Sequence, residues 1–166
     1  MPCPYFYPLH RQQDPGWERE PRWPLRALFD GECRACASEP RRPENPVLQE
    51  SCNRGYARGR CAEFPADPGS ADAVRFSVVH VREEDSEAAE GGSRLITGPG
   101  NGPVRLIWVL EKNYAPLEHG ELEYDPARDV ITPTPENPIL ARQVKVFLQS
   151  YLEGLRRPGA KAAGRG

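Results

Sequence analysis

The sequence predicts an α+β fold: a small antiparallel sheet, one long C-terminal helix packed on it, and an irregular N-terminal region rich in cysteine and proline. Three observations support this prediction. Apolar residues alternate along short segments between residues 74 and 131, as they do in half-buried strands. After Asn137 they recur at steps of three and four, as they do in an amphipathic helix. All 5 cysteines and 11 of the 19 prolines lie within residues 1–68, where extended and turned chain is therefore expected.

The length of 166 residues suits one domain, which we expect over residues 1–155. Within it, residues 1–68 would form a Cys/Pro-rich, metal-binding wrap, and residues 72–155 would form the sheet and helix. Residues 156–166 carry four basic residues and no acid, so a disordered tail is expected there.

The strands of the predicted sheet follow one another closely in the sequence. Residues 74–78 alternate between apolar and polar, and residues 104–111 are almost continuously apolar, which favours a central strand covered on both faces. Residues 121–124 alternate again before a turn at residues 125–126 leads to Val130 and Ile131. The spacing predicts an antiparallel meander of three or four strands. Residues 82–102, acidic and then glycine-rich, read as a long connection in which 94–97 is a candidate short strand.

The C-terminal helix has clear start signals, with Asn137 as N-cap and Pro138 as the first helical residue. The residues that form its apolar face are Leu140, Val144, Phe147, Leu148, Tyr151, Leu152 and Leu155. A second, shorter helix is predicted from Asn45 and Pro46 to a stop at Gly59. Its inner face would carry Leu48, Cys52 and Tyr56. Residues 2–43 are expected to be irregular chain wrapped over the core.

Charge and hydropathy exclude several classes of protein. The net charge is −2, so no overall field favours nucleic acid or an anionic membrane as a partner. No segment approaches the roughly 20 apolar residues of a membrane helix, and the N-terminus lacks the pattern of a signal peptide. A cytoplasmic location is therefore expected, where cysteines stay reduced and serve as ligands more often than as disulfides.

The cysteines are the strongest chemical signal. Cys3, Cys52, Cys61 and a loop cysteine, Cys33 in preference to Cys36, could converge on one metal centre, because thiolates are soft anionic donors for zinc and iron. Zinc sites usually take two close cysteine pairs, whereas only Cys33 and Cys36 form such a pair here. An iron–sulfur cluster accepts ligands from scattered loops, so a 4Fe-4S cluster is preferred and zinc is the alternative. Unrelated buried thiols remain a third interpretation.

Several segments together resemble a family of small uncharacterised bacterial proteins. They are PCPYFYP at residues 2–8, Cys33 after a glycine, CNRGYARGRC at 52–61, DAVRFSV at 72–78, EHGELEYD at 118–125, and the RQ-containing terminal helix. The resemblance covers most of the chain up to about residue 155, and the CNxGYARGxC pattern is its most specific part. It implies that Cys3, Cys33, Cys52 and Cys61 act together as ligands, with Cys36 an extra cysteine of this chain. It implies no activity.

The sequence therefore predicts a cytoplasmic metal-binding protein that holds an iron–sulfur cluster for electron transfer or redox sensing, with an unknown redox or protein partner. The alternative is a zinc-stapled adaptor that binds a protein through the arginine-bearing helix. Nucleic acid is a less favoured partner, because between residues 32 and 60 four acids accompany the six arginines. An enzyme with a cysteine nucleophile and His80 as base is a third reading. No catalytic residue is expected, since no spacing links a histidine to a cysteine.

Overall fold

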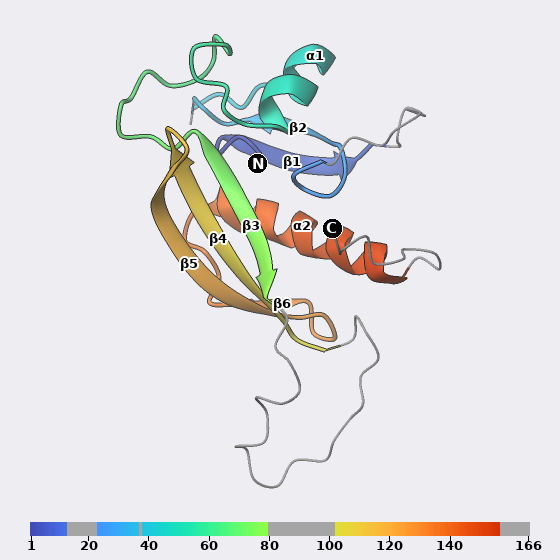
Figure 1. Ribbon diagram of the computed structural model, residues 1–166. Coiled ribbons are helices and arrows are strands. Elements are labelled where there is room, and N and C mark those ends of the chain that lie inside the picture. The colour runs from blue at the N-terminus through green and yellow to red at the C-terminus, as the bar shows by residue number, and fades with distance from the viewer. Residues whose placement is uncertain (13–22, 37, 80–101, 157–166) are drawn as a thin grey trace, which may run out of the picture.

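The computed structural model describes residues 1–12, 23–36, 38–79 and 102–156. Within these residues the fold is α+β, as predicted, with two antiparallel sheets and one long helix, α2, at Pro138–Arg156 (Figure 1). The smaller sheet pairs β1, Phe6–Arg11, with β2, Phe29–Cys33. The larger sheet contains β3, Ala73–Val79; β4, Val104–Lys112; β5, Ala115–Asp125; and β6, Val130–Thr132.

The four-stranded sheet is a meander with the strand order β3-β4-β5-β6. The meander agrees with the prediction, although β5 starts at Ala115, six residues before the predicted segment. Central strand β4 places Trp108 opposite Gly120, where an added Cβ would lie 2.5 Å from the indole ring. Of the apolar side chains on β4 only Leu106 is fully buried, so the expected cover on both faces of this strand is not observed.

A two-residue turn joins β4 to β5. Asn113 and Tyr114 both have positive φ, 49° and 64°, as a turn of this length requires. Asp72 accepts a hydrogen bond from the backbone N–H of Asn113 at 2.9 Å, and the ring of Tyr114 stacks on Tyr56 at 4.3 Å. The turn of the larger sheet is thus fastened to residues 56 and 72 of the chain.

Helix α2 begins as the sequence predicts. The Asn137 carboxamide oxygen accepts hydrogen bonds from the backbone N–H groups of Ile139, at 2.9 Å, and Leu140, at 3.2 Å. Its buried apolar residues are Leu140, Val144, Val146, Phe147, Leu148, Tyr151 and Leu152. Leu155 is 43% exposed, so the predicted apolar face ends one turn earlier than expected.

Replacing Asn137 by alanine is expected to lower the free energy of unfolding by about 1 kcal/mol, because two N–H groups at the start of α2 lose their acceptor. Asn137→Ser, which keeps an acceptor oxygen, should stay close to the parent. Urea unfolding followed by circular dichroism measures both variants. Equal stability of Asn137→Ala and the parent would contradict the role of this cap.

The N-terminal region is more regular than predicted, because β1 and β2 form a hairpin-like pair within residues 2–43. Phe6 lies opposite Cys33, and Gly31 lies opposite Pro8. A Cβ at Gly31 would come within 2.2 Å of the Tyr7 carbonyl oxygen, so this close pairing requires glycine. Proline in β1 hides the strand pattern, and the pairing joins residues about 18 to 27 positions apart, which local periodicity cannot reveal.

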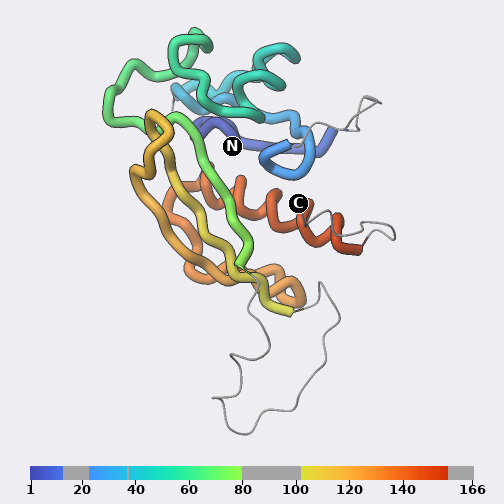
Figure 2. Tube along the Cα trace, viewed as in Figure 1, coloured from blue at the N-terminus to red at the C-terminus, as the bar shows by residue number. Residues whose placement is uncertain are grey.

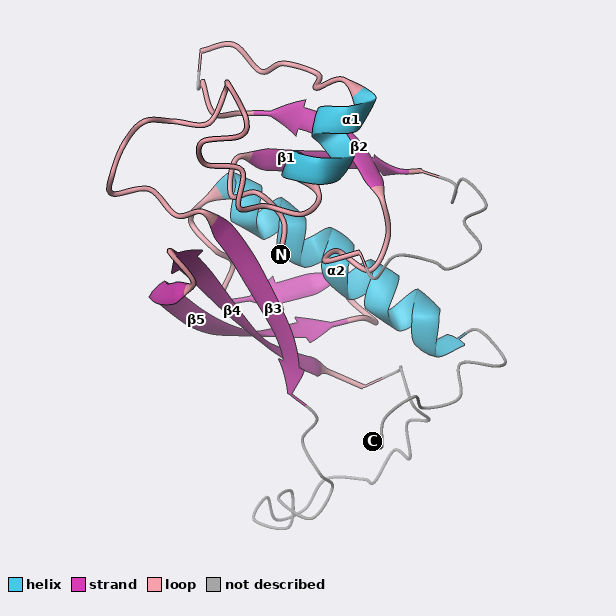
Figure 3. Ribbon diagram, turned by 45° about the horizontal axis from the view of Figure 1, so that its top comes forward, coloured by secondary structure: helices cyan, strands magenta, loops and turns pink. Residues whose placement is uncertain are grey.

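Helix α2 lies between the two sheets (Figures 1 and 3). On one side Phe147 packs against Phe76 of β3, with ring centroids 5.1 Å apart. On the other side the Gln143 amide nitrogen donates hydrogen bonds to the carbonyls of Cys3 and Phe6, at 2.8 and 2.7 Å. The trace in Figure 2 shows the N-terminal segment running beside this helix. Residues from both parts of the chain therefore share one core, which includes Phe6, Leu25, Val74, Leu106 and Leu148.

The predicted helix over 45–59 is shorter than expected. A turn of α-helix, α1 at Asn45–Val47, continues as a π-helical turn, η1 at Leu48–Cys52, and ends there. Glu44 is its N-cap, in place of the predicted Asn45. Tyr56 has a φ of 51° and lies beyond the helix, so it does not share a helical face with Cys52.

Three predictions fall on residues that the structure leaves undescribed: the connection at 82–102 with its candidate strand at 94–97, the tail after residue 156, and His80. Among the described helices, none has the length and apolar character needed to cross a membrane.

Candidate metal centre

Four of the five cysteines border one small cavity. Cys3 precedes β1, Cys33 ends β2, Cys52 ends η1, and Cys61 lies in the turns that follow. Tyr5, Glu63 and Phe64 also line the cavity. Cys36 is exposed and does not line it; its sulfur lies 3.3 Å from the Ser38 hydroxyl. The structure thus brings together the four cysteines named from the sequence and places the extra cysteine apart from them.

Backbone hydrogen bonds hold each of these cysteines in place. The Cys3 N–H donates to the Cys52 carbonyl at 2.9 Å, which joins the N-terminal segment directly to η1. Cys33 and Arg41 exchange two backbone hydrogen bonds, at 2.7 and 3.0 Å. The Cys61 N–H donates to the Ala57 carbonyl at 2.8 Å. The cavity therefore depends on tertiary contacts between segments that are distant in the sequence.

Asn53 connects η1 to β2. Its carboxamide oxygen accepts from the Phe29 N–H at 3.1 Å, while its amide nitrogen donates to the Phe29 carbonyl and the Leu48 carbonyl, both at 3.0 Å. The side chain is 1% exposed. These bonds end the π-helical turn and hold Cys52 over the β1–β2 sheet. Gly55 follows with φ 65°, at a point where a Cβ would lie 2.6 Å from the Met1 carbonyl oxygen.

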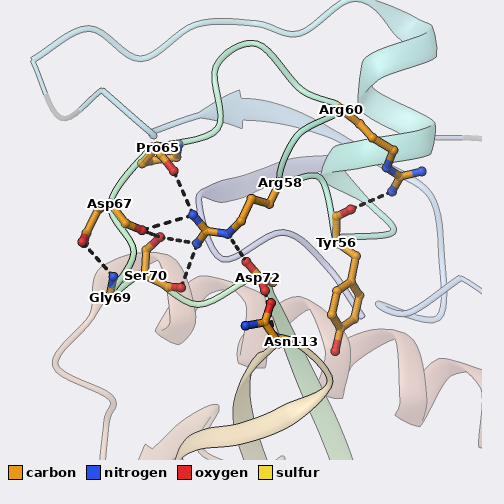
Figure 4. A network of polar contacts seen from close by, with 9 residues as sticks. All are labelled: Tyr56, Arg58, Arg60, Pro65, Asp67, Gly69, Ser70, Asp72 and Asn113. Atoms are coloured by element: carbon orange, nitrogen blue, oxygen red, sulfur yellow. Dashed lines mark hydrogen bonds and ion pairs between the residues drawn. The ribbon is translucent and has the colours of Figure 1, made fainter.

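All three arginines of the CNRGYARGRC segment contact other residues of the chain, and Figure 4 shows the contacts of Arg58 and Arg60. Arg58 pairs with Asp72 at 2.6 Å and donates to the carbonyls of Asp67 and Ser70, at 3.1 and 2.9 Å. Arg60 donates to the Tyr56 carbonyl at 2.8 Å. Arg54 lies 5.3 Å from the ring centre of Trp23. These contacts shape the chain between Cys52 and Cys61.

The four thiols around the cavity differ in how far they are buried. Cys3 and Cys52 are 7% and 4% exposed, whereas Cys33 and Cys61 are half-buried. Burial raises the pKa of the Cys3 thiol to about 12, and the nearby Cys33 and Cys61 thiolates add to the rise. Burial also raises the pKa of Cys52 and of Cys33, with neighbouring cysteines again contributing. Cys3, Cys33 and Cys52 are therefore neutral thiols near pH 7.

Neutral, buried thiols do not suit nucleophilic catalysis, which needs a lowered pKa. Cys36 does have a lowered pKa, because Ser38 hydrogen bonds to its sulfur. However, it is exposed, outside the cavity. The described histidines lie elsewhere: His10 is bonded to Asp30, and His119 is exposed on β5. The described residues offer no base beside a reactive thiol.

The residues of this cavity suit a metal in their chemistry, but not in their present arrangement. The donor set, four thiols, is suitable for zinc or an iron–sulfur cluster. The space between the thiols is about 10 Å³, which is roughly the room for one water. Among the described residues, no three Cys, His, Asp or Glu side chains are arranged so that they could hold a metal ion. Binding of a metal would therefore require the thiols to move.

Comparison with known proteins does not assign the chain to a family, since no protein-family model, no curated protein and no solved structure matches it.

Several residues that hold or line the cavity are not among the predicted ligands, and one of them, Gln143, carries no signal in the sequence. Gln143 ties α2 to the carbonyl of Cys3 although 140 positions separate the two residues. Tyr5 and Phe64 meet edge to face, with ring centroids 5.5 Å apart, and together cover part of the cavity. For Phe64 and Glu63 a local signal exists, because they follow Cys61 directly in the sequence.

Proposed function

We propose that this chain is a cytoplasmic metal-binding protein that holds a 4Fe-4S cluster through Cys3, Cys33, Cys52 and Cys61. The observation that supports the proposal is the meeting of these four thiols, from four separate segments, at one cavity. Such a cluster would supply one-electron chemistry, suited to electron transfer or redox sensing. Its redox or protein partner is unknown.

The electrostatics of the cavity would couple metal binding to the loss of the thiol protons. Cys3, Cys33 and Cys52 resist ionisation because they are buried and because each faces other cysteines. Four thiolates in this space would repel one another without a positive charge between them. A bound metal centre supplies that charge and displaces the thiol protons, so metal binding and thiol ionisation would occur together.

The arrangement of the ligands favours a cluster over a single zinc ion. A tetrahedral zinc with Zn–S bonds of about 2.3 Å needs sulfurs roughly 3.8 Å apart. Among the described residues, no three Cys, His, Asp or Glu side chains are placed to hold a metal ion as they stand, and only Cys33 and Cys36 have the sequence spacing of a zinc knuckle. A cluster accepts ligands that lie further apart. The half-buried side with Cys33 and Cys61 is where the cavity would widen.

A zinc-stapled adaptor for a protein partner is the second candidate, and the small volume of the cavity favours it. About 10 Å³ is closer to the size of one ion than to that of a cluster. In this case the metal would fasten the N-terminal region, and a surface elsewhere would bind the partner. A nucleic-acid partner has less support, because Arg58 and Arg60 already hydrogen bond within the chain.

Metal analysis of protein purified without oxygen tests the proposal. We expect iron and acid-labile sulfide in equal amounts, a brown colour, and loss of both when oxygen or a chelator is added. One zinc per chain and no sulfide would support the second candidate instead. Protein that contains no metal after anaerobic purification, and takes up neither iron and sulfide nor zinc, would contradict both.

A further inference from the structure

A second feature lies away from the cysteines, at the end of the larger sheet. A groove of about 480 Å³ runs between the inner face of β4 and β5 and the segment from Pro133 to Asn137 that leads into α2. Its floor is apolar and consists of Trp108, Leu110 and Leu140. A volume of this size is within the range of sites that bind small molecules or short peptide segments.

One wall of the groove is a strand edge without a partner. β6 pairs only with residues 123–125 of β5. The other part of this edge, residues 116–121, makes no backbone hydrogen bond to the Pro133–Asn137 segment or to any other described residue on that side. Leu117 on this edge is 50% exposed. An extended peptide could therefore add to the sheet here through main-chain hydrogen bonds.

The rim of the groove is acidic. Glu118, Glu121 and Glu136 line it, and among the residues that the structure describes no basic side chain does. Glu121 pairs with Arg105, whereas Glu118 and Glu136 have no ion-pair partner among the described residues. The Trp108 ring on the floor offers a face that attracts cations. Both features complement lysine or arginine side chains on an incoming strand.

We infer that this groove binds an extended, basic peptide segment of a partner protein, which pairs with residues 116–121 of β5 and turns its basic side chains to the inner face, where Trp108 and Glu118 lie. The basic side chains of the segment face Glu118 and Glu136. This binding site is independent of the metal centre, and its test does not depend on whether a metal is bound.

Three matched peptides test the inference by NMR titration of the full, isotope-labelled chain. The first alternates valine and lysine over seven residues, the second replaces each lysine by glutamate, and the third carries N-methyl groups on alternate amides. We expect saturable shifts at residues 116–121 and at the Trp108 indole N–H with the first peptide. The second should bind at least tenfold more weakly because of its charge. The third peptide should also bind at least tenfold more weakly, because its N-methylated amides cannot donate hydrogen bonds to the strand.

Two variants of the same strand provide the control. Glu118 lies on the inner face of β5 and Glu123 on the outer face, and both are exposed. Glu118→Lys should weaken binding of the lysine peptide about tenfold, and Glu123→Lys should leave it unchanged. Equal binding by all three peptides, or no saturable shift at millimolar peptide, would overturn the inference. Binding that appears only after residues 157–166 are deleted would assign the groove to the chain's own basic segment instead.

Discussion

Replacement of Cys52 by serine is expected to abolish metal binding and to expose residues 52–68 to protease. Cys52 is the most buried of the four thiols, and its carbonyl holds Cys3 through a backbone hydrogen bond. In the proposed site, three thiols and a hydroxyl would lack one soft donor, so the free energy of metal binding would no longer support this part of the fold. Metal content and limited proteolysis at Arg58 and Arg60 measure the two effects.

The structure limits how much of the N-terminal region is expected to unfold in Cys52→Ser. If the metal alone held the wrap over residues 1–68, the loss of Cys52 would release all of it. However, α2 also holds β1, because Gln143 bonds to the Phe6 carbonyl and Arg142 to the carbonyls of Pro8 and Leu9. We therefore expect β1 to stay in place in Cys52→Ser. Cys36→Ser is the matched control and should keep the full metal content. Full metal content in Cys52→Ser, or equal loss in Cys36→Ser, would contradict the proposed ligand set.

Replacement of Asn53 by alanine is expected to lower the free energy of unfolding by roughly 2 to 5 kcal/mol. The change removes three hydrogen bonds and leaves the Phe29 N–H and carbonyl without their Asn53 partner in a buried position. Because domains of this size are stable by only about 5–15 kcal/mol, this loss is a large fraction of the total stability. Urea unfolding of the metal-free protein measures the effect without a contribution from metal binding.

Asn45→Ala is the control for this prediction. It is the same substitution eight residues earlier in the same segment, at an exposed side chain for which the structure shows no hydrogen bond. We expect it to change stability by less than about 0.5 kcal/mol. Similar losses in Asn45→Ala and Asn53→Ala would mean that helix propensity, and not the buried carboxamide, determines stability here.

The parts of the fold that the sequence predicts are those with strong local patterns. α2 has a cap at Asn137 and a regular apolar period, and the meander consists of strands joined by short turns. The β1–β2 pair has neither advantage, because Pro8 interrupts one strand and the partner strand is distant. Its existence depends on contacts with α2, which no short window of sequence contains.

The position of Tyr56 is a second feature that local sequence patterns could not predict. Its spacing from Leu48 and Cys52 fits a helical face, and glycine at 55 is the only sign against a continuous helix. In the structure, Gly55 and Tyr56 both adopt positive φ because the Met1 carbonyl approaches Gly55 and Tyr114 stacks on Tyr56. Both contacts come from distant parts of the chain.

The clustering of the cysteines in the sequence predicts that they lie close together in the fold. Spacing alone does not decide between Cys33 and Cys36. Cys33 lies opposite Phe6 at the end of β2, and this pairing brings it to the cavity. Cys36 lies three residues further, in the turn beyond the strand, and is exposed. The difference between the two depends on where β2 ends.

The hydrogen bonds between Gln143 and the carbonyls of Cys3 and Phe6 also affect the order of events during synthesis on the ribosome. Residue 143 leaves the ribosome 140 residues after Cys3. At about 5–20 residues per second, this interval lasts roughly 7 to 28 seconds. The N-terminal segment has no helix to dock on until then, and Cys3 stays in contact with solvent and with other proteins as a free thiol. Insertion of the proposed metal centre would therefore be a late, post-translational event, and early oxidation of Cys3 in the nascent chain would prevent it.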